Sequence, residues 1–193
     1  MLARYINMDD KRQRILTATI QLIDENGLQS TPMSAIAKRA GVAMGTIYHY
    51  FPSKEELVAE LYQELTDKLG KYALADYDAK APVRARLARI VTNSTRFVLQ
   101  HPQEFMFWDQ YAYSPYIKPL AKVDKSGWMK AMNQIFVDGQ AQEILKPVDI
   151  ELLTKAVWGI ISALIKGHIV GKIVLDEAGL ETAVSFCWDA IKR

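Results

Sequence analysis

The densest group of side chains able to make specific polar contacts lies in the stretch GVAMGTIYHYF, residues 41–51. Gly45 is followed within four positions by Thr46, Tyr48 and His49, which carry two hydroxyl groups and an imidazole. Hydroxyls and a histidine are unusual in a protein core, whereas a fully solvated helix gains nothing from crowded aromatic rings. The stretch therefore indicates a short helix that lies against something polar and extended.

A nucleic acid would suit these residue types. A glycine inside a helix costs about 1 kcal/mol relative to alanine, and close approach of the backbone to DNA would offset that cost. The hydroxyl and methyl groups of Thr46 can contact base edges, while Tyr48 and His49 are long enough to reach phosphates. Lys54 stands at the start of the next helix. The alternative is a small solvent-exposed helix, and the residues alone favour DNA binding over it.

The flanking sequence predicts the elements of a helix-turn-helix. Residues 9–26 form an amphipathic pattern that ends at Gly27. A short second helix, MSAIAKRAG, is expected to start with Thr31 as its N-cap and Pro32 at its first helical position. A glycine turn, the stretch described above and a long helix over 53–74 follow, the last with the capping box of Ser53 and Glu56. The positions expected to face inward are Ile36, Ala37, Ala40, Val42, Ile47 and Phe51.

The rest of the chain is also predicted to be helical, with no strand-like alternation and no repeat. Further helices are expected over residues 81–101, 102–113, 119–140, about 150–172 and 177–191. The fold class is therefore all-α, with about nine helices. We expect a DNA-binding domain over residues 1–54, continuing into the linking helix 53–74, and a larger helical domain over residues 75–193.

The segment AIAKRAGVAMGTIYHYFPSKEEL resembles the DNA-binding signature of TetR-type (tetracycline-repressor-like, TetR/AcrR) transcriptional regulators. This resemblance covers roughly residues 9–60. It implies an all-helical homodimer that binds a palindromic operator in double-stranded DNA, most often as a repressor, and is released by a small, largely apolar effector. It also implies pairing of the last two helices and a ligand pocket in the middle helices.

Residues of this chain stand where members of that family contact DNA: Ser34, Met44, Gly45, Thr46, Tyr48, His49 and Lys54. Two positions depart from the family pattern. Ala43 replaces the serine that commonly caps the recognition helix, a cap worth about 1 kcal/mol. Met44 replaces a residue that is commonly polar or basic, so a base contact there would be apolar.

The last two helices offer apolar surface for a dimer interface. The first of them is apolar nearly all round, and small residues recur along it every four positions. The predicted interface residues are Leu152, Ala156, Gly159, Ile160, Ala163, Gly167, Leu180, Val184, Cys187, Trp188 and Ile191. The alternative is that both helices bury these side chains in the core of their own chain.

Aromatic residues in the middle of the chain are numerous enough to line an apolar pocket with a few polar groups. The predicted pocket residues are Phe97, Phe105, Trp108, Tyr111, Tyr113, Trp128, Met132 and Trp158. Each of them taken singly is better explained as plain core, but together they exceed what a domain of about 110 residues needs. A partner protein in place of a metabolite is a second reading of this half of the chain.

Other functional classes find little support. Three scattered histidines and one cysteine provide no metal-ligand spacing, and no phosphate loop or nucleophile motif is present, so we expect no metal, no cofactor and no enzyme activity. The longest apolar run, residues 156–165, is about half of a membrane span. With no secretory signal and no possible intrachain disulfide, a cytoplasmic protein is expected.

The net charge of +2 is too small to indicate nucleic-acid binding by itself. Its distribution is more informative, because residues 1–54 carry a balance of +3 and residues 55–78 a balance of −5. The basic excess therefore coincides with the predicted DNA-binding segment, although ordinary solvated faces would also explain it.

Overall fold

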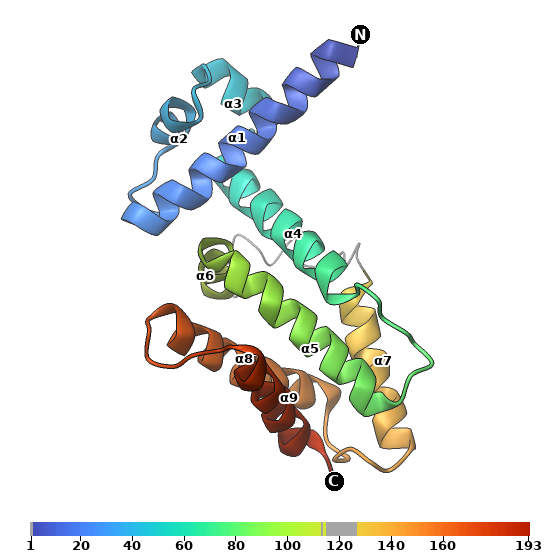
Figure 1. Cartoon of the computed structure of the whole chain (residues 1–193). Helices are drawn as coiled ribbons and strands as arrows, with labels where there is room; N and C mark the ends of the chain where they lie inside the picture. The colour runs from blue at the N-terminus through green and yellow to red at the C-terminus, as the bar shows by residue number, and fades with distance from the viewer. Residues whose placement is uncertain (1, 113, 115–126) are drawn as a thin grey trace. The chain divides into compact units, whose positions relative to one another are not determined.

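The structure, a computed structural model, describes residues 2–112, 114 and 127–193, with side chains described from Asp10 onward. The described chain forms nine helices and confirms the predicted all-α fold (Figure 1). They are α1 (Leu2–Asn26), α2 (Met33–Ala40), α3 (Met44–Tyr50), α4 (Lys54–Ala73), α5 (Val83–Gln100), α6 (Pro102–Tyr111), α7 (Trp128–Ala141), α8 (Ile150–Ile169) and α9 (Glu177–Ile191).

The start of α1 and the end of α8 differ from the predicted helix boundaries. α1 begins at Leu2 rather than at residue 9, and α8 ends at Ile169 rather than near residue 172. Gly171 follows the end of α8, and its φ of 72° lies in the left-handed region in which helices commonly end. Of the helix predicted over residues 119–140, the part before residue 127 lies outside the described residues.

The described residues divide into two compact units. The first contains the chain up to Leu65 and the described part of the segment that begins at Gln103. The second contains Thr66–Pro102 and the described residues from 127 onward. The sequence prediction kept residues 75–193 in one domain, whereas the structure places most of α6 in the first unit. The physical reason is that Phe107 and Tyr111 of α6 are buried in the core of that unit.

The first unit is built on α1, against which α2 and α3 pack (Figure 1). The apolar positions of α1 recur at three- and four-residue spacing, so they form one stripe facing the two short helices. The inward-facing positions predicted on α2 and α3 are confirmed as buried, with Val42 partly buried against them: Ile36, Ala37, Ala40, Ile47 and Phe51.

The capping box predicted at the start of α4 is confirmed, and α8 begins with a cap of the same kind. The Ser53 hydroxyl accepts the Glu56 amide at 3.1 Å, and the Asp149 carboxylate accepts the Glu151 amide at 2.7 Å. The prediction that Thr31 caps α2 is wrong. Pro32 holds that position without a side-chain hydrogen bond, because the buried Thr31 hydroxyl turns back to donate to the carbonyls of the preceding α1 turn.

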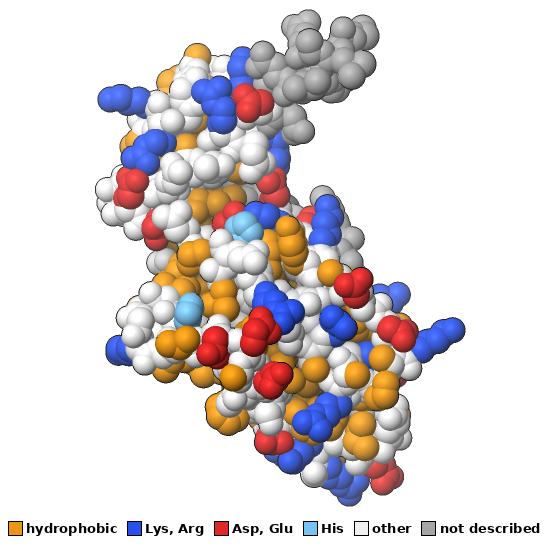
Figure 2. Space-filling model, in the orientation of Figure 1, with side chains coloured by type: hydrophobic (Ala, Val, Ile, Leu, Met, Phe, Trp, Pro, Cys, Tyr) orange, Lys and Arg blue, Asp and Glu red, His pale blue; other side chains and the backbone are white. Residues whose placement is uncertain are grey.

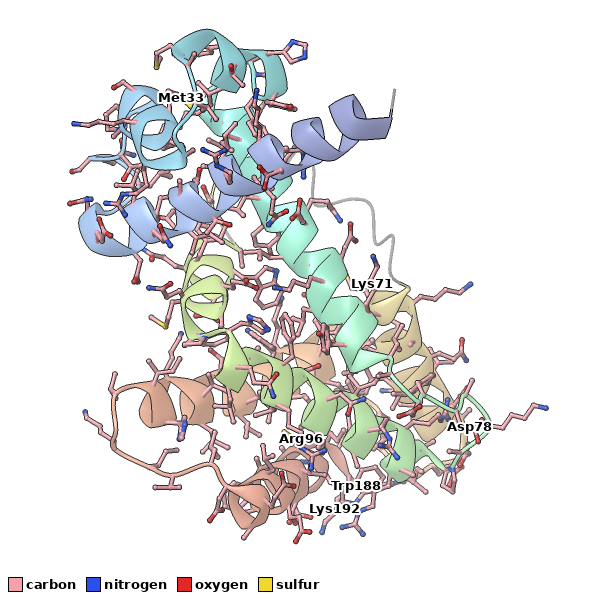
Figure 3. All side chains as sticks on the ribbon, turned by 45° about the horizontal axis from the view of Figure 1, so that its top comes forward. Met33, Lys71, Asp78, Arg96, Trp188 and Lys192 are labelled. Atoms are coloured by element: carbon pink, nitrogen blue, oxygen red, sulfur yellow. The ribbon has the colours of Figure 1, made fainter. Side chains whose placement is uncertain are left out.

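The second unit is organised around α5, which packs against α7, α8 and α9. The buried Arg86 of α5 pairs with Asp138 of α7 at 2.7 Å. α5 and α9, which carry Arg96 and Trp188 (Figure 3), lie against each other, and Arg96 pairs with Glu177 at the start of α9. These two ion pairs fix α5 against helices on two sides.

Candidate nucleic-acid interface

The turn between α2 and α3 is held by Arg14 of α1, a residue that the sequence analysis did not single out. Gly41 adopts the left-handed conformation, with φ of 64°, as the residue that ends α2. The guanidinium of Arg14, on α1, donates to the carbonyls of Ala40 at 2.5 Å and of Gly41 at 3.1 Å. A Cβ at position 41 would lie 2.6 Å from Arg14 Nη2, at the end of a flexible side chain that can shift, so it is the left-handed conformation that favours glycine there.

α3 exposes the face that the sequence predicted. Ile47 is fully buried, while Met44 is 41% exposed and Tyr48 is 48% exposed. Gly45 and His49 are exposed as well, and Thr46 is partly so. The helix thus places small and polar groups outward on the side opposite its buried residue, which is the arrangement that a helix entering the major groove needs.

The part of the chain that the structure describes gives no reason for Gly45 to be glycine. Its φ is not in the left-handed region, and no described atom lies within 4 Å of the position that its Cβ would occupy. An alanine would fit that space and would favour the helix by about 1 kcal/mol. A close contact between this exposed face and another molecule would explain why position 45 carries no methyl group.

α3 begins without a side-chain cap at its N-cap residue. Ala43 occupies the N-cap position in an extended conformation and makes no side-chain hydrogen bond to the helix. Its carbonyl accepts the Thr46 amide at 2.9 Å, which is the backbone part of a normal helix start. The seven-residue α3 therefore depends on its packing rather than on its cap.

Two predicted DNA-contact residues lie outside α3. Ser34 is exposed at the start of α2. Lys54 begins α4 and is partly buried, and its ammonium donates to the backbone carbonyl of Leu28 in the turn after α1. Since an ammonium has three N–H donors, two of them stay available for other partners.

The residues predicted to line an effector pocket are divided between the two units. Phe105, Trp108 and Tyr111 belong to α6 in the first unit, where Tyr111 is part of the core and Trp108 packs against it. The role of these three residues in an effector pocket stays a prediction. Tyr113 lies outside the described residues. The second unit contains the remaining four: Phe97, Trp128, Met132 and Trp158.

Phe97 lies in an aromatic cluster of the second unit. Its ring centroid is 4.6 Å from that of Tyr72 and 4.4 Å from that of His101, and the Lys68 ammonium lies 5.4 Å from it. Nearby on the same helix, the buried hydroxyl of Ser94 has no hydrogen-bond partner among the described residues. A buried, unsatisfied hydroxyl costs about 1–3 kcal/mol.

The predicted dimer residues also divide into two groups. Leu152, Ala156, Gly159 and Ala163 form one exposed stripe on α8, and Leu152 is 63% exposed. Ile160, Gly167, Val184 and Trp188 are partly buried. Leu180, Cys187 and Ile191 are buried among the helices of their own chain, so their prediction as interface residues is wrong. Their stripe on α9 faces the core of the second unit.

Gly159, Gly167 and Phe186 show further which parts of α8 and α9 are exposed. Among the described residues nothing lies within 4 Å of the position that a Cβ of Gly159 would occupy, whereas a Cβ at Gly167 would lie 3.1 Å from the Ile173 side chain, which would have to shift slightly. Phe186 on α9 is 53% exposed and was missed by the sequence prediction. Its position outside the buried α9 stripe was the available signal. Figure 2 shows hydrophobic side chains at several places on the surface of the second unit.

α8 is the described helix that is long and apolar enough to cross a membrane by length and composition, and 28% of its most apolar window is buried. Core helices of soluble proteins pass the same test, so this is weak evidence of a membrane span.

Cys187, packed against α8, is shielded from water, and burial raises the pKa of its thiol to about 12. The thiol is therefore structural rather than reactive.

Comparison with known families covers both units. The model for bacterial regulatory proteins of the tetR family matches residues 15–61. The model for the tetracyclin repressor-like C-terminal domain matches residues 82–192. The two matches together span most of the chain, and the first contains α2, the turn and α3.

Individual proteins agree with the family models. The fatty acid metabolism regulator protein of Bacillus subtilis is 25% identical over 177 residues, covering 90% of this chain and 91% of that protein. The HTH-type transcriptional repressor KstR of Rhodococcus jostii is 35% identical over 137 residues, covering 66% of this chain and 58% of that protein.

Solved structures share the fold over nearly the full length. A TetR family transcription regulator from Marinobacter aquaeolei superimposes with a TM-score of 0.87 at 24% identity, covering 100% of this chain and 99% of that one. FadR from Bacillus subtilis, in complex with stearoyl-CoA, gives a TM-score of 0.71 at 25% identity over 90% of this chain and 98% of that one. The chain therefore belongs to the tetR family and is a helix-turn-helix, DNA-binding transcriptional regulator rather than an enzyme.

Proposed function

We propose that this regulator is a cytoplasmic repressor that binds a palindromic operator as a homodimer and is released by a small, largely apolar effector. The observation that carries the DNA-binding part is the exposed face of α3, with a glycine at position 45 that the chain itself does not require. A backbone without a side chain at that point can approach a groove of the duplex closely.

The DNA contacts follow from the geometry of that face. Thr46 would contact a base edge, Met44 would pack on a thymine methyl group, and Tyr48 and His49 would reach phosphates beside the groove. Lys54 and Ser34 would contact phosphates at the two ends of the motif. These phosphate contacts position the protein, and the residues near the start of α3 carry the sequence preference.

The dimer is proposed to form through the exposed stripe of α8 together with Phe186 of α9. A contiguous apolar surface on a soluble regulator is unfavourable in water, so a second copy that covers it lowers the free energy. Gly159 and the two alanines of the stripe would let the backbones of the two α8 helices approach closely. Two recognition helices related by a two-fold axis then read two half-sites.

The effector is proposed to bind in the second unit near Phe97, Trp128, Met132 and Trp158. The unsatisfied hydroxyl of Ser94 on α5 supports a polar group of the ligand there. The structurally similar FadR from Bacillus subtilis is in complex with stearoyl-CoA, so an acyl chain is the first ligand class to test. Release requires that the ligand prefer the form that cannot bind DNA. α4, whose residues belong to both units, is the proposed lever.

Selection of bound duplexes from a random pool tests the DNA-binding proposal directly. The expected product is a palindromic consensus whose half-sites are separated by at least one helical turn. Well-folded protein that enriches no duplex sequence, or enriches an asymmetric single site, would contradict the proposal.

Replacing Gly45→Ala should affect folding and DNA binding in opposite directions. The free protein should be more stable by about 1 kcal/mol, because alanine favours the helix and meets no neighbour. Binding to the selected duplex should weaken, because the methyl group occupies the space of close approach. Denaturant unfolding and a fluorescence binding titration measure the two effects. Ala43→Ser, which restores a cap on the same helix, is the matched control for stabilisation alone.

Introducing a charge into the α8 stripe should separate the copies. Ala156→Glu would place a carboxylate in the interface, where burying an unpaired charge is strongly unfavourable. Sedimentation velocity should show wild-type protein at twice the mass of the chain and the variant as a monomer with the same helical content. Asn133→Glu, an exposed position on α7, is the control and should remain dimeric. A dimeric Ala156→Glu variant would place the interface elsewhere.

Long acyl chains should stabilise the protein and weaken its hold on DNA. Stearoyl-CoA is expected to raise the melting temperature, whereas coenzyme A alone should not, because the apolar chain supplies the buried surface. The same compound should reduce affinity for the selected duplex. A screen of small apolar compounds without any stabilisation would favour the alternative, in which this half of the chain binds a partner protein.

A further inference from the structure

The last two carbonyl groups of the α2 end are satisfied by a side chain from another helix. Neither the Ala40 carbonyl nor the Gly41 carbonyl accepts a backbone amide among the described residues. Carbonyls at a helix end need water or a side chain as a donor. Nη2 of Arg14, on α1, lies 2.5 Å from the Ala40 oxygen and 3.1 Å from the Gly41 oxygen. One guanidinium therefore fixes both peptide groups at which the chain turns towards α3.

The other recorded ion pair of Arg14 is weak. Its Nη1 lies 3.8 Å from a carboxylate oxygen of Asp10 on the same helix, and both side chains are exposed. An exposed pair of this kind contributes about 0–1 kcal/mol. The two turn carbonyls are therefore the stronger partners of this guanidinium.

The end of α3 is fixed by different contacts. Phe51 follows α3 directly and is fully buried. The guanidinium of Arg12 lies 5.7 Å from the centroid of the Phe51 ring and also binds Glu60 and Glu64 of α4. The end of α3 is thus held between α1 and α4 without help from Arg14.

The start of α3 has weaker supports of its own. Ala43, its N-cap residue, makes no side-chain hydrogen bond to the helix, and Val42 before it is only partly buried. A helix that is fixed at its end and loosely held at its start can turn about its end. The contact of Arg14 with the preceding turn opposes that motion at the start of α3, where the residues proposed to carry the sequence preference lie.

We propose that Arg14 is a positioning residue for sequence recognition: through the carbonyls of Ala40 and Gly41 it sets the direction in which α3 enters the groove, and it does not itself bind a phosphate. The inference rests on the proposed DNA contacts of α3. The hold of Arg14 on the turn is therefore tested first without DNA, and its consequence for recognition second.

Amide hydrogen exchange in the free protein tests the hold on the turn. The reporter is the Gly41 amide, hydrogen-bonded to α2 at 3.2 Å, and the reference is the Gly27 amide, hydrogen-bonded to α1 at 2.8 Å, both glycines having a left-handed φ. Arg14→Met should speed exchange at Gly41 severalfold relative to Gly27, because the turn opens locally more often. Lys11→Met, which removes the same charge from the same helix, should leave the ratio of the two rates unchanged. An unchanged ratio in Arg14→Met would overturn the proposal.

The consequence for DNA is measured as the ratio of affinities for the selected duplex and for a scrambled duplex of the same length. A phosphate contact strengthens binding to both duplexes alike, whereas a correctly directed helix favours the selected one. Arg14→Met should lower this ratio by about tenfold, the fold-change that corresponds to one hydrogen bond to a charged group. Lys11→Met should leave the ratio unchanged.

A second variant keeps the test valid if Arg14→Met does not fold. Arg14→Lys retains the positive charge but not the planar guanidinium that reaches both carbonyls, so it should lower the affinity ratio as well. A wild-type ratio in Arg14→Lys, or an equal loss for both duplexes in Arg14→Met, would overturn the positioning role, because Arg14 would then act through its charge or through the fold. Faster exchange at Gly41 in a protein whose wild type prefers no duplex would instead refute the proposed function, and leave only the hold on the turn.

Discussion

The function of this regulator depends on how α3 is anchored. A seven-residue helix without an N-terminal side-chain cap is not stable alone in water, because helix nucleation is costly and too few hydrogen bonds follow. Burial of Ile47 and Phe51 supplies the free energy that stabilises α3. Gly41, in the left-handed conformation and hydrogen-bonded through its carbonyl to Arg14, fixes the direction in which the chain enters the helix. Because the anchoring uses one face completely, the opposite face is left free to meet DNA.

The charges of the first unit follow the same division of roles. Part of the basic excess predicted for residues 1–54 is used in contacts within the protein. Arg12 pairs with Glu60 and Glu64 of α4 at 3.0 and 2.6 Å, and Arg39 makes a two-point contact with Glu25, both N–O distances being 2.8 Å. The acidic excess that follows in the sequence is therefore partly a set of partners for these arginines.

Much of the fold could be predicted because it depends on periodicity and on local signals. The inward positions Ile36, Ile47 and Phe51 follow from helical spacing. The residue types of Ser53 and Asp149 indicate the starts of two helices. Thr31 has the same local signal, yet its hydroxyl satisfies α1 carbonyls instead. That choice depends on the tertiary position of the turn, which no local pattern contains.

The site was predicted unevenly for the same reason. Exposure of Met44 and Tyr48 follows from subtracting the buried face of one short helix. The assignment of Tyr111 to the core of the first unit does not, because it depends on which unit α6 joins, and an aromatic segment fits a pocket or a core equally well. Likewise, the two apolar stripes of α8 and α9 look alike in sequence, but only that of α8 faces outward.

Hydroxyl-radical footprinting of Met44 and Tyr48 with and without DNA tests the central claim most directly. Met129 on α7, which is 50% exposed against 41% for Met44, provides an internal reference of the same chemistry. With saturating duplex, oxidation of Met44 and Tyr48 should fall severalfold while that of Met129 stays constant. Unchanged oxidation of Met44 and Tyr48 in a complex shown to be fully formed would mean that the outward face of α3 does not enter the duplex.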